Sequence, residues 1–390
     1  MLYYFEFNTW FKLIHLASAV PSELQRRGLR RLLLLTIPLR VLVHSVCFFL
    51  DGVLFPGLWR VKVKAPVFVI GHARSGTTLA HRLLCMDERM SAFKYWELRL
   101  PSLLEKKLVR ALAWLDRHVF GRRIERRLVA WEERKFGAVK QIHKMGLNVP
   151  EEDDLVLYDS CASGFWMTKL PFMGDLDFFH LDRRPPRRRR RLMRFYRECV
   201  RRQLYLNGDG KIHLSKNPAW CGRVESLLEV FPDARFVVLY RNPYETIPSL
   251  LKLLHVSWKH AGNVDAVKIA ESTRAMTDLS YEHYLYPLET LARHPQTPVA
   301  SIDYRELIAE PKRTIERACL QLGLGMTDQF SAALQREQAR ARRHETEHRY
   351  SLAEFGLDDR EIRTRLSPLF ERFGWDAEVP LPKAGERQHA

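Results

Sequence analysis

Apolar residues recur along the chain in two distinct patterns. Short apolar runs at Val67–Ile70, Arg235–Tyr240 and Val299–Ile302 are typical of strands that are buried in a parallel sheet. Each run is followed by a longer stretch in which apolar residues recur every three or four positions, which predicts a helix. Strands that alternate with helices in this way indicate an α/β protein with a central, mainly parallel sheet.

Other parts of the chain predict helical or irregular structure around these units. Residues 103–135 place apolar and basic side chains at helical spacing, and Asp358–Phe373 predicts a C-terminal helix. Residues 145–180 contain glycines and prolines that interrupt any regular period. We therefore expect one domain over residues 61–390, preceded by a basic and apolar helical segment at residues 1–60.

Within that N-terminal segment, Leu32–Phe55 is apolar over a length that suits a membrane-spanning helix. The run is interrupted by Pro38, Arg40, His44 and Asp51. A charged side chain at the centre of a bilayer costs about 2.5 kcal/mol or more, which disfavours a true span. Two further interpretations stay open: a helix that lies in the membrane interface, and a helix that is docked on the protein's own core.

The composition indicates an anionic partner. Lys and Arg number 63 against 46 Asp and Glu, which gives a formal net charge of +17. Such an excess favours nucleic acid, a membrane surface, or a ligand that carries phosphate or sulfate. The 46% of hydrophobic residues excludes an intrinsically disordered chain. Six cysteines without a CxxC pair, and no visible secretory signal, favour a reducing, cytoplasmic location.

A phosphate-binding loop is predicted at Gly71–Thr78, with the sequence GHARSGTT, between the first strand and the next helix. Its two glycines have the spacing of a nucleotide-binding P-loop, but threonine stands where the P-loop lysine is expected. The cation in the loop is Arg74 instead. The residues whose backbone N–H groups or hydroxyls are expected to surround an anion are Ser75, Gly76, Thr77 and Thr78.

A second motif lies at the junction of the second strand with its helix, in RFVVLYRNPYETIPS. Arg241 ends the strand, and Ser249 follows eight residues later. A guanidinium fork and a hydroxyl near a helix N-terminus suit a phosphate dianion. Together with HARSGTTL, this junction resembles the sulfotransferases that use 3′-phosphoadenosine-5′-phosphosulfate (PAPS). The RSGTT core is similar to that of tyrosylprotein sulfotransferases and many bacterial members, and the resemblance covers Val61–Phe373.

The resemblance implies a P-loop-like three-layer fold and a transferase. The reaction would move a sulfuryl group from PAPS to an acceptor hydroxyl, or less readily an amine, without a metal ion. It further implies that the loop binds the 5′-phosphosulfate and that Arg241 and Ser249 bind the 3′-phosphate. Tyr304 in IDYREL resembles the tyrosine near the adenine. Arg74 and Lys216, the latter in HLSKNP, are expected to neutralise the leaving group.

The general base is assigned to Glu97 in KYWELR, because the tyrosylprotein branch uses a glutamate that follows the loop helix. Apolar neighbours such as Trp96 would raise the pKa of this carboxyl and improve it as a base. The alternative is a structural ion pair between Glu97 and a neighbouring arginine. The histidine that cytosolic sulfotransferases place after their lysine is replaced here by Pro218.

The acceptor is predicted from the arginine-flanked N-terminal segment. We expect a lipid, glycolipid or polyisoprenoid-linked glycan, with the protein peripheral on the cytoplasmic face of an anionic membrane. Two other function classes stay open. One is a P-loop kinase or nucleotide hydrolase, disfavoured by the missing lysine. The other is an inactive scaffold that binds anionic lipid.

Three charged motifs are not assigned to the active site. His344–His348 satisfies HExxH, but its polar surroundings argue against zinc. Glu151–Asp154 is expected to be a solvated loop on the acceptor side. Arg187–Arg191 comes without a nucleic-acid-binding fold, so we expect no nucleic-acid partner.

Overall fold

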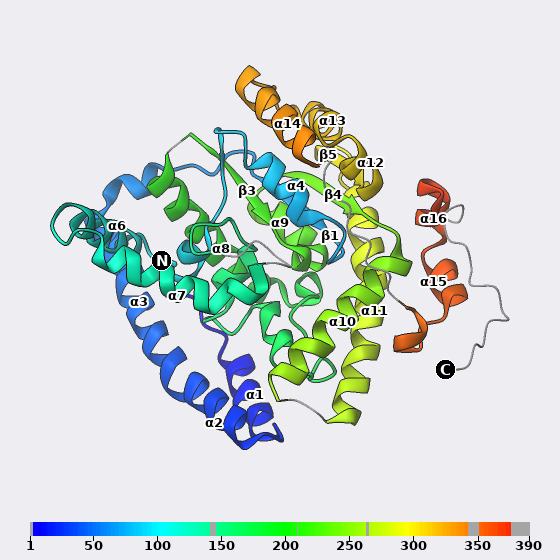
Figure 1. Cartoon of the computed structure of the whole chain (residues 1–390), viewed down its shortest axis with the longest axis horizontal. Coiled ribbons are helices and arrows are strands. Elements are labelled where there is room, and N and C mark those ends of the chain that lie inside the picture. Colours follow the sequence, from blue (N-terminus) through cyan, green and yellow to red (C-terminus); the bar gives the residue numbers. More distant parts are fainter. Residues whose placement is uncertain (1–2, 141–145, 209, 263–264, 342–350, 376–390) are drawn as a thin grey trace.

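The computed structural model describes residues 3–140, 146–208, 210–262, 265–341 and 351–375. A parallel sheet lies at its centre (Figure 1), and in the described residues it has five strands in the order β2–β3–β1–β4–β5. The strands are β1 (Val67–Gly71), β2 (Met90–Ser91), β3 (Ile212–Lys216), β4 (Arg235–Tyr240) and β5 (Val299–Asp303). The α/β architecture with a parallel sheet is therefore confirmed, and β4 has the predicted bounds.

Successive residues of a strand point to opposite faces of the sheet and enter two different apolar cores. In β1, Phe68 and Ile70 belong to the larger core, and Val67 and Val69 belong to the smaller one. The larger core is covered by α8 (Pro186–Asn207), α9 (Val224–Val230), α10 (Pro243–His260) and α11 (Ala266–Ala292). The smaller core is covered by α4 (Thr77–Leu84), α12 (Tyr304–Ala309), α13 (Pro311–Gln321) and α14 (Asp328–Ala341). Helices on both faces complete three layers.

The strands β2 and β3 were not predicted. β2 has only two residues, which is too short to show a period. β3 is buried, but three of its five residues are polar, namely His213, Ser215 and Lys216. Their polar groups are satisfied inside the protein, for example by the 2.9 Å contact between Lys216 Nζ and a glutamate far along the chain. Because that partner is not visible from local sequence, the strand lacks an apolar pattern.

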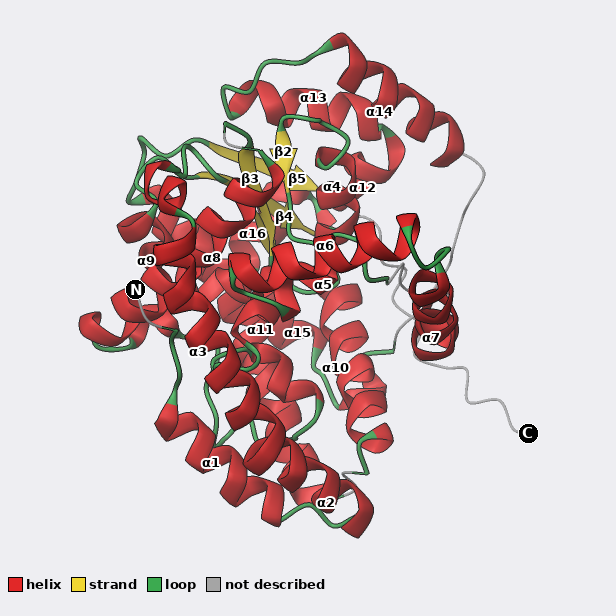
Figure 2. Cartoon of the chain, turned by 90° about the vertical axis from the view of Figure 1, so that its left-hand side faces the viewer, coloured by secondary structure: helices red, strands yellow, loops and turns green. Residues whose placement is uncertain are grey.

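The N-terminal segment is helical and packs on the rest of the chain. Its elements are α1 (Phe7–Ser18), α2 (Glu23–Arg31), the π-helical turn η1 (Leu32–Thr36) and α3 (Ile37–Leu54). One side of this segment, including Leu33, Ile37 and Phe48, is buried in the larger core. α3 packs against α6 (Leu103–His118), and Figure 2 shows both helices on the side that faces the viewer. The structure therefore has the arrangement in which this helix is docked on the protein's own core.

Helices also occupy the predicted region 103–135, as α6 and α7 (Arg123–Lys140), with the short α5 (Tyr95–Arg99) before them. The C-terminal prediction of one helix over Asp358–Phe373 is wrong in one respect. There are two helices, α15 (Asp359–Arg365) and α16 (Ser367–Phe373), because a proline without an N–H group stands at the start of the second. The HExxH motif at His344–His348 lies outside the described residues.

Candidate active site

Two glycines shape the loop between β1 and α4. Gly71 has φ +140°, and a Cβ atom there would lie 2.4 Å from the carbonyl oxygen of Leu239. Gly76 has φ +90°, and its Cβ atom would lie 2.4 Å from the ring of Tyr304. Both positions therefore require glycine, for the backbone conformation as well as for the space. The loop is held tightly against β4 on one side and against the start of α12 on the other.

Arg74 joins the two sequence motifs. Its φ of 74° is uncommon for a residue other than glycine and is frequent at functional loops. Its Nε atom donates a hydrogen bond to Ser249 Oγ at 3.1 Å. Its carbonyl oxygen accepts one from Arg241 Nη1 at 3.4 Å. The loop and the β4–α10 junction, separated widely in sequence, thus meet at the carboxyl edge of the sheet.

Arg241 also contacts the third predicted donor-site element. Its guanidinium lies 4.4 Å from the ring centre of Tyr304, which begins α12 directly after β5. The same guanidinium donates from Nε to Glu245 Oε2 at 2.9 Å. Tyr304 therefore lies against both Gly76 and Arg241. The structure brings these predicted residues together in one place.

The loop residues with side-chain hydroxyls differ in exposure. Ser75 and Thr77 are buried, whereas Thr78 is exposed. The backbone N–H of Ser75 donates to the carbonyl of His72 at 3.1 Å, so in this structure it closes the loop.

A neighbouring donor is without a partner. Asn217 follows β3, and its backbone N–H donates to the carbonyl of Val69 in β1 at 3.1 Å. The side chain of Asn217 is buried, and its Nδ2 atom has no hydrogen-bond partner among the residues that the structure describes. An unsatisfied buried donor costs about 1–3 kcal/mol, and such groups in native proteins often serve a ligand. This position at the carboxyl edge of the sheet fits a bound anionic group.

His72 and Tyr284 brace the loop, and neither was among the predicted site residues. Their rings stack with centroids 4.9 Å apart and an interplanar angle of 9°. Tyr284 donates from Oη to the carbonyl of Arg241 at 2.6 Å. Burial lowers the pKa of His72 to about 4, so the ring is neutral at pH 7. The pair could not be recognised in the sequence, because Tyr284 lies in a long helix more than 200 positions after the loop.

Lys216 forms an ion pair with Glu152. Lys216 ends β3 and is buried, and its Nζ atom lies 2.9 Å from Glu152 Oε1. The Glu152 side chain is 25% exposed. Burial raises the pKa of Glu152, and the charge of Glu151 raises it further, whereas Lys216 opposes the shift. A partly exposed carboxyl with a raised pKa beside a buried lysine is suited to acid–base chemistry.

The expectation that Glu151–Asp154 is a solvated loop is wrong, because the run is largely buried. Asp153 Oδ2 lies 3.1 Å from His213 Nε2, and Asp154 Oδ2 accepts a hydrogen bond from Ser163 Oγ at 2.6 Å. These contacts fix the segment and leave its second glutamate beside the lysine. The only sequence signal for Glu152 is the run of four acidic residues that follows Pro150.

Glu97 lies in a different environment. Its carboxylate is buried and accepts hydrogen bonds from the backbone N–H of Lys94 at 3.0 Å and from the side-chain amide of Asn207 at 3.1 Å. Arg110 Nη2 lies 4.0 Å away. These contacts join α5 to the end of α8 and agree with the structural ion-pair alternative. The structure does not bring Glu97 into contact with Lys216.

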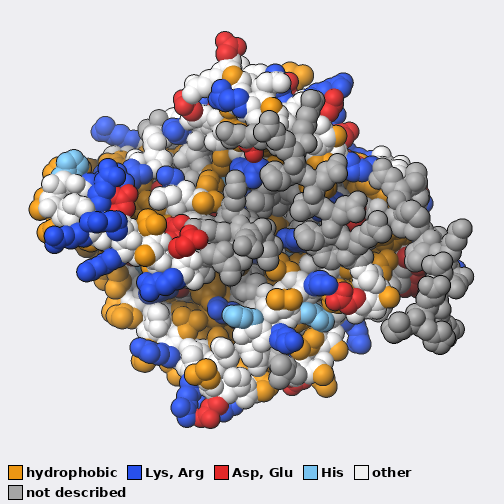
Figure 3. Space-filling view, in the orientation of Figure 1, with side chains coloured by type: hydrophobic (Ala, Val, Ile, Leu, Met, Phe, Trp, Pro, Cys, Tyr) orange, Lys and Arg blue, Asp and Glu red, His pale blue; other side chains and the backbone are white. Residues whose placement is uncertain are grey.

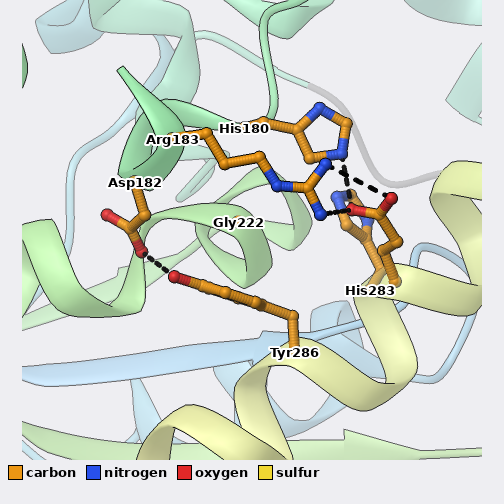
Figure 4. Close-up of a pocket in the computed structure, with 7 residues that line it drawn as sticks. His180, Asp182, Arg183, Gly222, His283 and Tyr286 are labelled. Carbon is orange, nitrogen blue, oxygen red and sulfur yellow. Dashed lines mark hydrogen bonds and ion pairs between the residues drawn. The ribbon is translucent and has the colours of Figure 1, made fainter. Parts of the chain in front are cut away.

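A small cleft elsewhere on the molecule is lined by charged residues (Figure 4). Its volume is about 10 Å³, which is the space of about one water molecule. Arg183 pairs with Glu282 at 2.7 Å, and Tyr286 donates to Asp182 at 3.1 Å. The cleft is therefore too small for a nucleotide, and its charges are paired with one another.

Comparison with known proteins agrees with this fold. The sequence model of the Sulfotransferase family matches residues 66–328, and the chain therefore belongs to the sulfotransferase family. The omega-hydroxy-beta-dihydromenaquinone-9 sulfotransferase Stf3 of Mycobacterium bovis is 26% identical over 337 residues, which is 83% of this chain and 78% of that protein. Stf3 of Mycobacterium tuberculosis matches with the same values.

Two solved structures share the fold. Sulfotransferase STF9 from Mycobacterium avium has a TM-score of 0.71 at 19% identity, covering 95% of this chain and 93% of that one. Sulfotransferase STF1 from Mycobacterium tuberculosis H37Rv has a TM-score of 0.66 at 18% identity, covering 93% and 92%. The predicted three-layer fold is confirmed. The resemblance seen in the two motifs is confirmed by the family match, and the protein is a sulfotransferase enzyme.

Proposed function

We propose that this sulfotransferase moves a sulfuryl group from PAPS to a hydroxyl group of a lipid acceptor at the cytoplasmic face of a membrane. The observation that carries the donor assignment is the contact of Arg74 Nε with Ser249 Oγ at 3.1 Å. PAPS is anionic at both its 5′ and its 3′ positions. A site in which two cationic strand–helix junctions touch is suited to hold both groups at once.

In this proposal the nucleotide lies across the carboxyl edge of the sheet. Arg241 and Ser249 bind the 3′-phosphate, which replaces Glu245 as the partner of the guanidinium. Tyr304 provides an aromatic surface for the adenine, next to the same guanidinium. The buried amide of Asn217 supplies a further donor. The loop residues that we assign to the 5′-phosphosulfate are Ser75, Gly76, Thr77 and Thr78.

The chemistry is an in-line displacement at sulfur. The acceptor oxygen forms a bond to sulfur while the bond from sulfur to the phosphate oxygen of PAPS breaks, and 3′-phosphoadenosine-5′-phosphate leaves. Arg74 and Lys216 neutralise the charge that grows on the leaving oxygen. With two fixed cations in place, we expect no metal ion to be required. Binding both substrates in one site lowers the entropic cost of bringing them together.

The proton of the acceptor hydroxyl needs a base. Glu97 is the residue expected from sequence, but its burial and its contact with Asn207 favour a structural role. We assign the base to Glu152, because its carboxyl is partly exposed and has a raised pKa. Because we assign Lys216 to the leaving group, a carboxyl 2.9 Å from its Nζ atom is close enough to serve the same reaction. The proton passes to Glu152 as the oxygen attacks.

The acceptor class rests on similarity and on surface chemistry. The 26% identical mycobacterial relatives are named for a hydroxylated dihydromenaquinone. The N-terminal helices of this chain expose apolar side chains beside arginines, which suits a membrane-dissolved substrate. A hydroxylated isoprenoid lipid is thus the acceptor that we test first. The absence of a nucleic-acid partner remains a prediction.

The test is a transfer assay with radiolabelled PAPS and the purified chain. Hydroxylated isoprenoid quinones, a glycolipid and a soluble sugar are offered as acceptors in detergent micelles. We expect label in the isoprenoid fraction with the wild type and none with Arg74→Ala. Label in the soluble sugar, with none in the quinones or the glycolipid, would contradict the lipid acceptor.

A further inference from the structure

The outward side of the helix formed by η1 and α3 is apolar along its length. Six side chains spaced by three or four residues are each 50–65% exposed: Leu35, Leu39, Leu42, Val46, Phe49 and Val53. On the neighbouring α6, Leu108 and Leu112 are 53% and 58% exposed. We call these eight residues the apolar face. Soluble proteins rarely leave so continuous an apolar stripe in water, and such stripes mark interaction surfaces.

The opposite side of the same helix is fixed to the protein. Asp51 is fully buried and accepts hydrogen bonds from Arg202 Nε at 2.7 Å and from the backbone N–H of Leu103 at 2.8 Å. His44 Nδ1 lies 2.7 Å from Glu105 Oε1. By length and composition, the helix over residues 23–54 is apolar enough to cross a membrane. A span would expose these buried polar groups to lipid, at a cost of several kcal/mol. The helix therefore suits the surface of a bilayer better than its interior.

Basic residues border the apolar face. Arg30 and Arg31 are exposed at the end of α2, directly before the stripe begins. On α6, Lys107 Nζ lies 5.1 Å from the ring centre of Phe55, the residue that directly follows α3. Figure 3 shows Lys and Arg side chains gathered at the left-hand end of the molecule, where Figure 1 places α6, and hydrophobic side chains below them. An apolar stripe with a basic border matches acyl chains next to anionic headgroups.

The same charges argue against a second copy of this chain as the partner. In a symmetric dimer through the apolar face, the basic border of one copy would lie against the basic border of the other. With a net charge of +17, the two copies would repel each other. An anionic leaflet neutralises the border instead. The charge pattern therefore selects a bilayer.

The helix α3, which carries most of this face, and the neighbouring α7 both contact the segment that contains Glu152. Arg40 on α3 lies 3.5 Å from Asp159, seven residues after Glu152. On α7, which packs against α6, Glu132 accepts a hydrogen bond from the backbone N–H of Leu147 at 3.1 Å. Glu152 thus lies on a segment that is attached on both sides to the helices next to the apolar face.

We propose that the apolar face docks on an anionic bilayer with α3 parallel to the membrane plane, so that the acceptor reaches Glu152 and Lys216 without passing through water. The lipid nature of the acceptor rests on the proposed function, but docking itself requires no turnover. The protein is thus attached to one leaflet and does not span it. Apolar contact supplies the attachment and the arginines supply the preference for anionic lipid.

The experiment is flotation of the full chain with phosphatidylcholine vesicles, with and without phosphatidylglycerol. The test variant is Leu39→Ser with Phe49→Ser. The control is Val267→Ser with Leu320→Ser, two exposed apolar residues on α11 and α13. We expect the wild type and the control to float with anionic vesicles, and the test variant to float at least about tenfold less. Unchanged binding of 3′-phosphoadenosine-5′-phosphate verifies that the test variant is folded.

Three results would overturn the proposal. The first is a wild type that stays unbound with anionic vesicles, and the second is a test variant that floats as well as the control. The third is a wild-type dimer in solution that the test variant converts to a monomer, which would assign the face to a second copy. Failure of the proposed function is distinguishable. Flotation that depends on the apolar face, without sulfuryl transfer to any lipid, would leave the docking intact and remove the lipid acceptor.

Discussion

Lys216 Nζ lies 2.9 Å from Glu152 Oε1, although 64 residues separate the two in sequence. The lysine is buried at the end of β3, and the glutamate keeps part of its surface in contact with solvent. In the proposed mechanism, the pair combines the cation that neutralises the leaving group with the carboxyl that accepts the proton of the acceptor. This arrangement is the basis of the assignment of Glu152 as the base.

Replacement of this carboxyl distinguishes the two candidate bases. In Glu152→Gln we expect kcat to fall by about 100-fold or more, because a positioned general base contributes about 10²–10⁴. Affinity for 3′-phosphoadenosine-5′-phosphate should change little, since the side chain does not contact the nucleotide motifs. Steady-state kinetics and calorimetry measure the two effects. Glu97→Gln is the matched control. It should lower the thermal stability and leave kcat nearly unchanged. A large loss of kcat in Glu97→Gln, with kcat nearly unchanged in Glu152→Gln, would assign the base to Glu97.

The pH dependence of the rate follows from the same group. A base acts in its ionised form, so kcat should rise as the pH increases through the pKa of Glu152. The ordinary pKa of a glutamate is about 4.3. Because burial raises the pKa of Glu152, the rise in kcat should occur at a higher pH than this. A pH–rate profile of the wild type and of Glu152→Gln tests this. The rise should be absent from the residual activity of the variant, and its persistence would assign it to another group.

Gly76 provides a test of the loop geometry. In Gly76→Ala the new Cβ atom would lie 2.4 Å from the ring of Tyr304, so the ring or the loop must move. We expect nucleotide affinity to fall by about tenfold or more. Gly323→Ala is the matched control, because Gly323 also has positive φ, at +64°, but nothing lies within 4 Å of its Cβ position. Equal affinity losses in both variants would mean that a general destabilisation, and not a change in the loop at Gly76, is responsible.

His44 predicts a pH dependence of stability. Burial disfavours its charged form, but hydrogen bonds and charges from Asp159 and Glu105 dominate and raise its pKa. A raised pKa in the folded state stabilises the protein below the ordinary pKa of histidine, and this contribution is lost as the pH rises through the folded value. The free energy of unfolding should therefore fall as the pH rises from the ordinary pKa of histidine, about 6.5, through the higher pKa of His44 in the folded state.

The control for this prediction is His44→Gln, in which that part of the fall should disappear. Chemical denaturation at a series of pH values from below to above the ordinary pKa of histidine measures it. An identical pH dependence in the wild type and in the variant would show that His44 does not contribute.

The sequence predicted those parts of the molecule whose signals are local. The loop at Gly71–Thr78 and the junction at Arg241 each lie within one strand–turn–helix unit, and the structure joins them through Arg74 and Ser249. Partners that are distant in sequence were not predictable in this way. The position of Glu152 and the strand β3 depend on contacts between acidic residues and Lys216 or His213 that form only in the folded chain. Glu97 has the right local surroundings, but the fold places Asn207 against it.

Calorimetry with 3′-phosphoadenosine-5′-phosphate tests whether the two motifs bind PAPS. Wild type and Arg241→Ala are titrated without metal, with ATP and magnesium in parallel. We predict metal-independent binding that weakens by at least about tenfold in the variant, because charge-assisted hydrogen bonds to the 3′-phosphate are lost. Preference for magnesium-ATP, or no binding of either nucleotide, would contradict the account.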